Sequence, residues 1–85
     1  MDISRAEQRI LHTLAQGGSL HLIRNASGDV TGIEGYTRDG WLMSGVTLAL
    51  FRKLKRKDAI ASHGGRPYHI TRRGLELVRS QVDNR

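Results

Sequence analysis

The chain has 85 residues, of which 38% are hydrophobic, and this is enough for one small domain with a modest core. It has no cysteine, which excludes a disulfide framework and a thiolate metal site. The net charge of +6 is uneven, because residues 1–51 hold four Lys or Arg and five acids whereas residues 52–85 hold ten and three. A basic half beside a near-neutral half predicts a polyanion or an acidic protein surface as partner, although a role in solubility would explain the charge too.

Nothing in the chain predicts insertion into a membrane. The longest apolar run, Val46–Phe51, is six residues long and is interrupted by Thr47, whereas a membrane span needs roughly 20 residues. The N-terminal residues are polar and lack the apolar core of a signal peptide. We therefore expect one soluble, cytoplasmic domain over residues 1–85.

The first predicted element is an amphipathic helix over Arg5–Gln16. Ser4 and Glu7 have the spacing of a capping box, in which each side chain accepts a hydrogen bond from the other's amide. Apolar residues then recur every three or four positions, at Ile3, Ala6, Ile10, Leu11 and Leu14. Gly17-Gly18 is expected to end the helix, because glycine adopts the left-handed conformation without steric penalty.

A β-hairpin is predicted next, over Ser19–Tyr36. One face of its first strand holds Leu20, Leu22 and Arg24, and the turn chemistry lies in Asn25–Asp29. In the second strand, Gly32 and Gly35 indicate a bulge or a close contact. After another turn at residues 37–40, we expect three apolar residues to enter the core: Trp41, Leu42 and Met43.

The second half of the chain has the layout of a recognition helix followed by a wing. Ser44 is the expected N-cap of the helix. The inner arc of this helix consists of Val46, Thr47, Leu50, Phe51 and Leu54, and the opposite arc of Gly45, Ala49, Arg52, Lys53 and Arg56. Ile60–Ser62 and Tyr68–Ile70 are predicted strands joined by a turn at Gly64-Gly65. Thr71 is expected to cap a last helix with an inner stripe of Leu75, Val78 and Val82.

The resulting order, α-β-β-α-β-β-α, predicts a small α+β domain that is winged-helix-like. A standard winged helix has a short second helix before its recognition helix, and here a hairpin takes that place. This departure argues against ordinary reading of the DNA major groove.

The basic residues of this second half are the candidate binding site for a partner or a nucleic acid: Arg52, Lys53, Lys55, Arg56, Lys57, Arg66, Arg72 and Arg73. Runs of cations attract phosphate and carboxylate surfaces. The alternative is that cations in the last turn of a helix offset its macrodipole, which explains Lys55 to Lys57 better than Arg52 and Lys53. At the start of the last helix the dipole disfavours Arg72 and Arg73, so either an external anion or plain solvation accounts for them.

The remaining patterns indicate neither a cofactor nor catalysis. The four histidines are spread along the chain and lack the further ligands that would complete a zinc site. They form no recognisable nucleophile spacing with serine or aspartate. The paired glycines do not match a phosphate loop. We therefore predict no metal, no cofactor and no enzyme activity.

Three stretches of the chain resemble the YjhX toxin family: Ser4–Gly18, Thr47–Lys57, and Gly65–Ile70 followed by Gly74-Leu75 and the tail from Val78. The resemblance implies a small toxin that inhibits bacterial DNA topoisomerase I and is paired with an acetyltransferase-like antitoxin. It transfers no catalytic residue. The first hypothesis is thus an inhibitor that docks its basic face on topoisomerase I or on the enzyme's DNA complex. The second is a winged-helix transcriptional regulator that binds double-stranded DNA directly.

Overall fold

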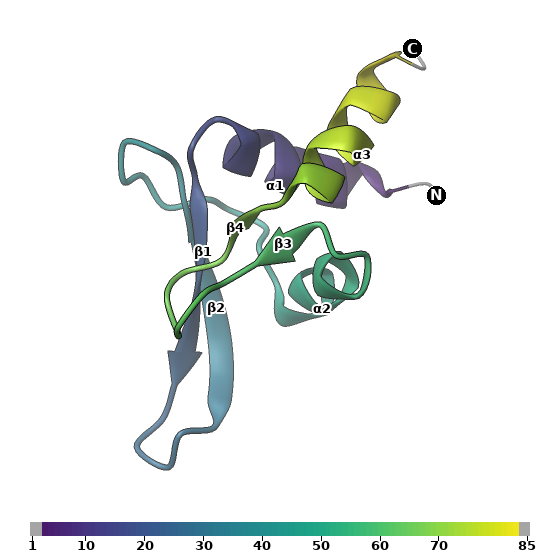
Figure 1. Ribbon diagram of the computed structural model, residues 1–85. Coiled ribbons are helices and arrows are strands. Elements are labelled where there is room, and N and C mark those ends of the chain that lie inside the picture. The colour runs from purple at the N-terminus through teal and green to yellow at the C-terminus, as the bar shows by residue number, and fades with distance from the viewer. Residues whose placement is uncertain (1–2, 84–85) are drawn as a thin grey trace.

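The computed structural model describes residues 3–83, which form three helices and two antiparallel two-stranded sheets (Figure 1). In chain order the elements are α1 (Arg5–Ala15), β1 (Ser19–Arg24), β2 (Val30–Tyr36), α2 (Leu48–Arg56), β3 (Ile60–Ala61), β4 (His69–Ile70) and α3 (Arg72–Asp83). The α+β class and the predicted element order are confirmed. No helix among these residues is long and apolar enough to span a membrane.

Helix α1 begins and ends as its sequence predicts. The Ser4 amide donates to Glu7 Oε1 at 2.9 Å, and the Glu7 amide donates to Ser4 Oγ at 3.1 Å. At the other end Gly17 has a φ of +106°, and its amide donates to the Leu14 carbonyl. The Gly18 amide reaches the Thr13 carbonyl, which completes a Schellman motif.

Strands β1 and β2 form the predicted hairpin, and they project away from the helices (Figure 1). The register shifts between Ile23 and Arg24, which pair with Gly32 and Val30. Thr31 is therefore the extra residue of a bulge beside Gly32, as expected there.

The segment between β2 and α2 differs from the prediction. Trp41 and Leu42 are 74% and 62% exposed, and only Met43 is half-buried. Leu42 forms an antiparallel bridge with Tyr36, and the Met43 amide donates to the Gly35 carbonyl, so the segment folds back beside the end of β2 instead of entering the core. The expected Ser44 cap is also wrong: Thr47 caps α2, because Gly45 has a φ of +77° that no α-helix contains.

The inner face of α2 is largely as predicted. Phe51 and Leu54 are buried, and Val46 and Leu50 lie half-buried against the core. Thr47 is exposed, since its hydroxyl accepts from the Leu50 amide as the helix cap.

The β3–β4 pair with its connecting loop, which the sequence analysis predicted as a wing and which keeps that label here, is tied to the first hairpin through the backbone. Leu20 and Tyr68 exchange two hydrogen bonds, of 2.9 and 2.8 Å. Strands β3 and β4 are each one residue shorter than predicted, and Gly64 and Gly65 have the positive φ that the turn requires. The wing therefore lies beside β1.

Helix α3 starts at its predicted cap, where the Gly74 amide donates to Thr71 Oγ1 at 3.1 Å. Its buried stripe consists of Gly74, Leu77 and Val78, with Leu75 only half-buried. A Cβ on Gly74 would clash with the Ala59 carbonyl oxygen, so glycine allows α3 to approach the backbone at Ala59 closely. The predicted Val82 contact lies outside the described side chains.

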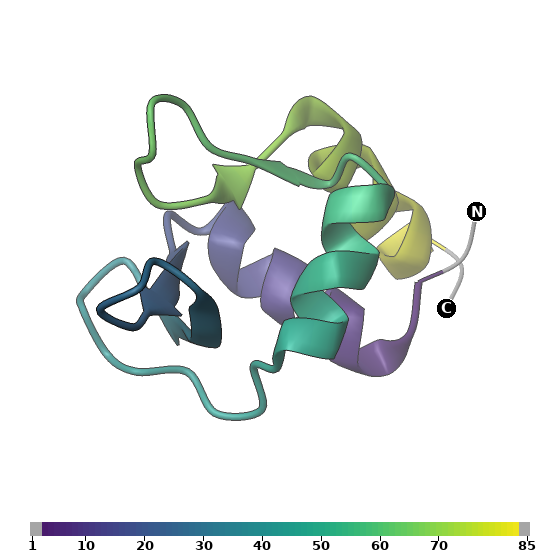
Figure 2. The same cartoon turned by 90° about the horizontal axis from the view of Figure 1, so that it is seen from below.

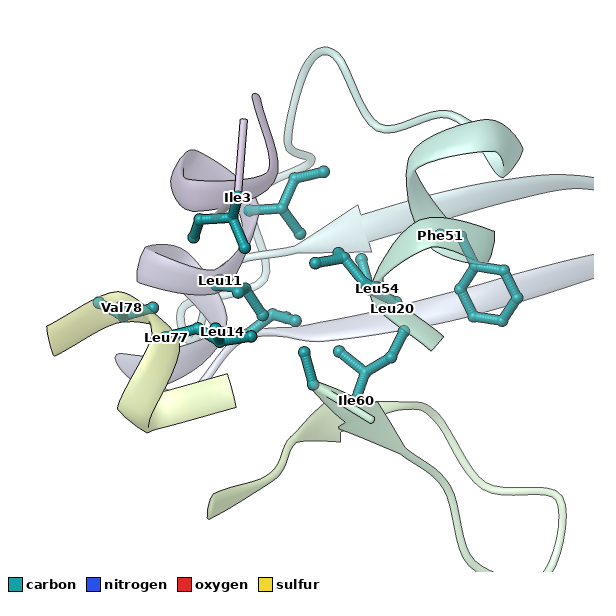
Figure 3. Packing of buried hydrophobic residues seen from close by; sticks show 11 residues of the cluster. Ile3, Leu11, Leu14, Leu20, Phe51, Leu54, Ile60, Leu77 and Val78 are labelled. Atoms are coloured by element: carbon teal, nitrogen blue, oxygen red, sulfur yellow. The ribbon is translucent and has the colours of Figure 1, made fainter. Parts of the chain in front are cut away.

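One core holds these elements together. Figure 3 shows its side chains coming from both halves of the chain, with Leu11 and Leu14 of α1 near Leu77 of α3. Leu20 of β1 and Leu54 of α2 have no exposed surface. The burial of these faces determines which side of α2 is left to solvent.

Candidate functional site

Four cationic side chains of α2 face solvent: Arg52, Lys53, Lys55 and Arg56. They lie opposite Phe51 and Leu54, whose burial fixes the rotation of the helix. Within residues 3–83, Arg52, Lys53 and Arg56 take part in no ion pair. These three charges are therefore not neutralised by the described part of the molecule.

Lys55 differs from its neighbours because it contacts the base of the wing. Its Nζ lies 5.9 Å from the centroid of the Tyr68 ring, within cation–π range. Tyr68 in turn meets Phe51 edge to face, with centroids 4.9 Å apart. The wing and the basic helix are thus held together by one aromatic side chain.

Lys57 differs from this exposed set because it is half-buried and ion-paired, and its predicted part in partner binding stays a prediction. Its Nζ lies 2.7 Å from Glu7 Oε2, and Glu7 is only 2% exposed. Burial disfavours the ionised Glu7, but the hydrogen bonds from Lys57 and Ser4 outweigh it, so the pKa of Glu7 is lowered. Lys57 therefore serves to join α2 to α1. A sequence signal existed, because Glu7 falls on the apolar stripe of α1.

A shallow cleft of about 360 Å³ lies between α1 and α2 at this ion pair. Its lining consists of Glu7, Lys53, Arg56 and Lys57. Lys53 and Arg56 thus continue the basic surface up to the neutralised pair.

The start of α3 adjoins the end of α2. The Thr71 amide donates to the Ala59 carbonyl at 2.9 Å, and the Thr71 hydroxyl donates to the Asp58 carbonyl. This places the exposed Arg72 and Arg73 next to the basic helix. Arg73 lies 3.4 Å from Glu76, so it has the local anion that the sequence analysis did not find. Both side chains of that pair are about half exposed, which makes the interaction weak.

Arg66 is exposed on the wing and lines a cleft of about 250 Å³ between the wing and β1. Across this cleft lies Arg24, which the sequence analysis did not name as a site residue. Arg24 Nη1 donates to the Gly28 carbonyl at 2.8 Å, which holds its side chain against the hairpin. The signal for Arg24 was its place on the same strand face as Leu20 and Leu22, which also line the cleft.

Among residues 3–83 one serine–histidine pair resembles part of a catalytic triad. Ser19 Oγ lies 2.9 Å from His21 Nε2, a pair that the sequence spacing did not indicate. Within residues 3–83 no carboxylate bonds the other ring nitrogen of His21, and such a group orients a catalytic histidine. The same residues contain no cluster of three His, Asp or Glu side chains able to hold a metal ion.

Comparison with known proteins covers the whole chain. Residues 1–85 match a family described as "Putative toxin of bacterial toxin-antitoxin pair". The chain is 65% identical to a UPF0386 protein of Chelativorans sp. and 64% identical to one of Agrobacterium fabrum, with 100% of each chain covered. A UPF0386 protein of Hyphomonas neptunium is 64% identical, with 99% of each chain covered. No solved structure matches the chain.

Proposed function

Since the chain belongs to the YjhX toxin family, we propose that it is the toxin of a toxin–antitoxin pair and acts by binding, without catalysis. The target is bacterial DNA topoisomerase I or the complex of that enzyme with DNA. The toxin occupies the surface through which DNA enters and so prevents strand passage.

The observation that carries this proposal is the cationic face of α2. Arg52, Lys53 and Arg56 are exposed and form no ion pair within residues 3–83. Three neighbouring charges without an internal partner favour an external anion, and a DNA-processing enzyme working on its substrate presents many. Arg66 on the wing and Arg72 at the start of α3 are further exposed cations that we include in the proposed contact.

The partner of the pair is an acetyltransferase-like antitoxin, as the YjhX resemblance implies. A stoichiometric inhibitor suits such a pair, because bound antitoxin needs only to cover or displace the toxin. Inhibition by occupancy is also consistent with the Ser19–His21 pair, for which no third member lies among residues 3–83.

A second candidate function is direct binding of duplex DNA by a winged-helix-like regulator. Its support is the position of α2, which is connected through Tyr68 to the wing that carries Arg66. The hairpin that replaces the usual second helix makes this the weaker candidate.

The experiment is a charge reversal on α2, Arg52→Glu with Arg56→Glu. We expect this variant to need at least about tenfold more protein to inhibit plasmid relaxation by topoisomerase I, since two bound charges each contribute about 1 kcal/mol or more. Arg5→Glu with Arg79→Glu is the matched control, because it removes the same charge at two other exposed positions. An equal loss of inhibition in both variants would mean that inhibition depends on the net charge of the protein and not on the cationic face of α2.

The affinity for free duplex DNA distinguishes the two candidate functions. A regulator that neutralises about four phosphates should lose affinity with a log–log salt slope near −4. Weak duplex binding together with strong inhibition of topoisomerase I supports the inhibitor. Normal relaxation in the presence of excess wild-type protein would refute it.

A further inference from the structure

The segment of residues 37–42, here called the Trp41 tip, exposes two large apolar side chains that are consecutive in the sequence. Trp41, the only tryptophan of the chain, is 74% exposed, and Leu42 is 62% exposed. The only other large apolar side chain exposed among the described residues is Ile23, at 39%. Neither residue of the tip contributes to the core, so the fold itself gives no reason for an indole at this position.

The Trp41 tip is held in one conformation by its own backbone. The Thr37 amide donates to the Trp41 carbonyl at 2.8 Å, and the Trp41 amide donates to Thr37 Oγ1 at 3.1 Å. The Gly40 amide donates to the Thr37 carbonyl at 2.9 Å, and Gly40 has the φ of +90° that this turn needs. Leu42, at the end of the tip, forms an antiparallel bridge with Tyr36, which directly precedes the tip. An exposed tryptophan on an ordered turn loses little entropy when it binds.

The chemistry of the Trp41 tip suits a protein pocket and not a polyanion. Arg38 and Asp39 are its charged residues, and their charges cancel. Tryptophan is the residue type most often found as the buried anchor of a protein interface. In Figure 2 the loop between β2 and α2, which carries the tip, passes the β1–β2 hairpin on the side away from the loop between β3 and β4.

We propose that the Trp41 tip is the antitoxin-docking site, with Trp41 and Leu42 inserted into an apolar pocket of the antitoxin. The partner follows from the family, whose members are paired with an antitoxin. The inference rests on that pairing and not on the target proposed for the basic surface. A second copy of this chain, joined through the tip in a symmetric dimer, is the alternative occupant, and the oligomeric state tests it.

The single tryptophan makes the first test direct. In the isolated protein, Trp41 fluorescence should be that of a solvated indole and should be quenched freely by acrylamide. Addition of the purified acetyltransferase-like antitoxin should move the emission to shorter wavelength and protect the indole from acrylamide. A solvated Trp41 in a complex that forms at micromolar concentration would overturn the proposal, and so would failure of the two proteins to bind.

Truncation tests whether the contact matters energetically. Trp41→Ala should weaken antitoxin binding by at least about 30-fold, the loss typical of an interface hot spot, and Trp41→Phe should weaken it less. Ile23→Ala is the matched control, because it shortens an exposed apolar side chain away from the tip and should change affinity less than about threefold. Equal effects of Trp41→Ala and Ile23→Ala would overturn the proposal, provided that both variants melt like the wild type.

The salt dependence of antitoxin affinity and the oligomeric state of the isolated protein distinguish the antitoxin from other occupants of the tip. An apolar anchor predicts antitoxin affinity that changes less than about threefold between 50 and 200 mM salt, unlike the steep loss expected of phosphate binding. If Trp41 is already shielded in the isolated protein and the chain sediments as a dimer, a second copy covers the tip and the proposal is wrong. A Trp41→Ala protein that still inhibits topoisomerase I but escapes the antitoxin would separate this surface from the basic one.

Discussion

At the residue scale, the carboxylate of Glu7 takes part in two separate interactions. One oxygen of its carboxylate accepts from the Ser4 amide in the capping box, and the other accepts from Lys57 at 2.7 Å. The two partners come from different parts of the chain, so a single buried side chain fixes both the start of α1 and the end of α2. The orientation of the basic face depends on this junction.

The first prediction concerns the charge of Glu7. Glu7→Gln keeps the capping box, because glutamine also serves at that position. It leaves the ammonium of Lys57, whose side chain is 19% exposed, without this carboxylate. We expect the free energy of unfolding at pH 7 to fall by roughly 1–3 kcal/mol, measured by urea denaturation. A loss below about 0.5 kcal/mol would mean that the pair is only a surface contact.

The ion pair between Glu7 and Lys57 also predicts that the free energy of unfolding depends on pH. The pKa of Glu7 is lowered from its ordinary value of 4.5, so the folded state prefers the ionised carboxylate. Its contribution to stability is therefore complete above that value, and it is lost as the pH falls through the lower folded-state pKa. The difference between wild type and Glu7→Gln should shrink as the pH decreases below 4.5. A difference that stays constant from pH 7 to pH 3 would contradict this assignment.

At the scale of the elements, α1 and α2 end in the same way with different residues. In α2 the Asp58 amide donates to Lys55 and the Ala59 amide to Leu54, which repeats the Schellman pattern of α1. Gly17 occupies the left-handed position in α1, whereas Asp58 occupies it in α2 with a φ of +56°. A side chain in this conformation is strained, and a negative charge at a helix C-terminus opposes the macrodipole.

This comparison predicts a stabilising substitution. Asp58→Gly should raise the free energy of unfolding by about 0.5–1 kcal/mol, because glycine adopts the left-handed conformation without a Cβ clash. Asp58→Asn separates the two causes, since asparagine tolerates this conformation but removes the charge. The melting temperatures of both variants are compared with that of the wild type. An Asp58→Gly protein that is less stable than the wild type would contradict the claim that Asp58 is strained.

Local signals predicted most of the elements because their causes lie within a few residues. The capping box at Ser4, the Asn25–Asp29 turn and the Gly64-Gly65 turn each act through their own backbone. The start of α2 could not be predicted in this way, since Ser44 and Thr47 are both capable caps. The positive φ of Gly45 decides between them, and it depends on how the loop leaves the hairpin.

The same limit explains what the sequence did not reveal at the candidate site. The basic residues were proposed from composition and their binding role stays a prediction, while α2 faces outward as its periodicity predicts. Lys57 and Glu7 are 50 positions apart, so a sequence pattern could not reveal that they meet. Leu77 was omitted from the predicted stripe of the last helix, and Trp41 was wrongly expected in the core. The close approach of Gly74 to Ala59 and the bridge between Leu42 and Tyr36 are defined only by the tertiary structure.

At the scale of the whole molecule, the charge distribution opposes folding. Residues 52–85 hold ten of the fourteen Lys and Arg but only three acids. Within residues 3–83 two ion pairs form, one of them partly exposed, so most of these cations repel one another. A cationic surface that costs stability is expected where binding, and not packing, explains its presence.

The last prediction measures that cost. Arg52→Glu with Arg56→Glu lowers the net charge from +6 to about +2, since each change removes two charge units. Wild-type stability should increase by a few tenths of a kcal/mol when salt is raised from about 10 to 150 mM, because the Debye length falls from roughly 30 to 8 Å and screens the repulsion. The variant should be at least as stable as wild type at low salt and should gain less from salt. If the variant is instead less stable by more than about 1 kcal/mol, both arginines are needed for the fold, and they cannot be assigned to the recognition of an external anion.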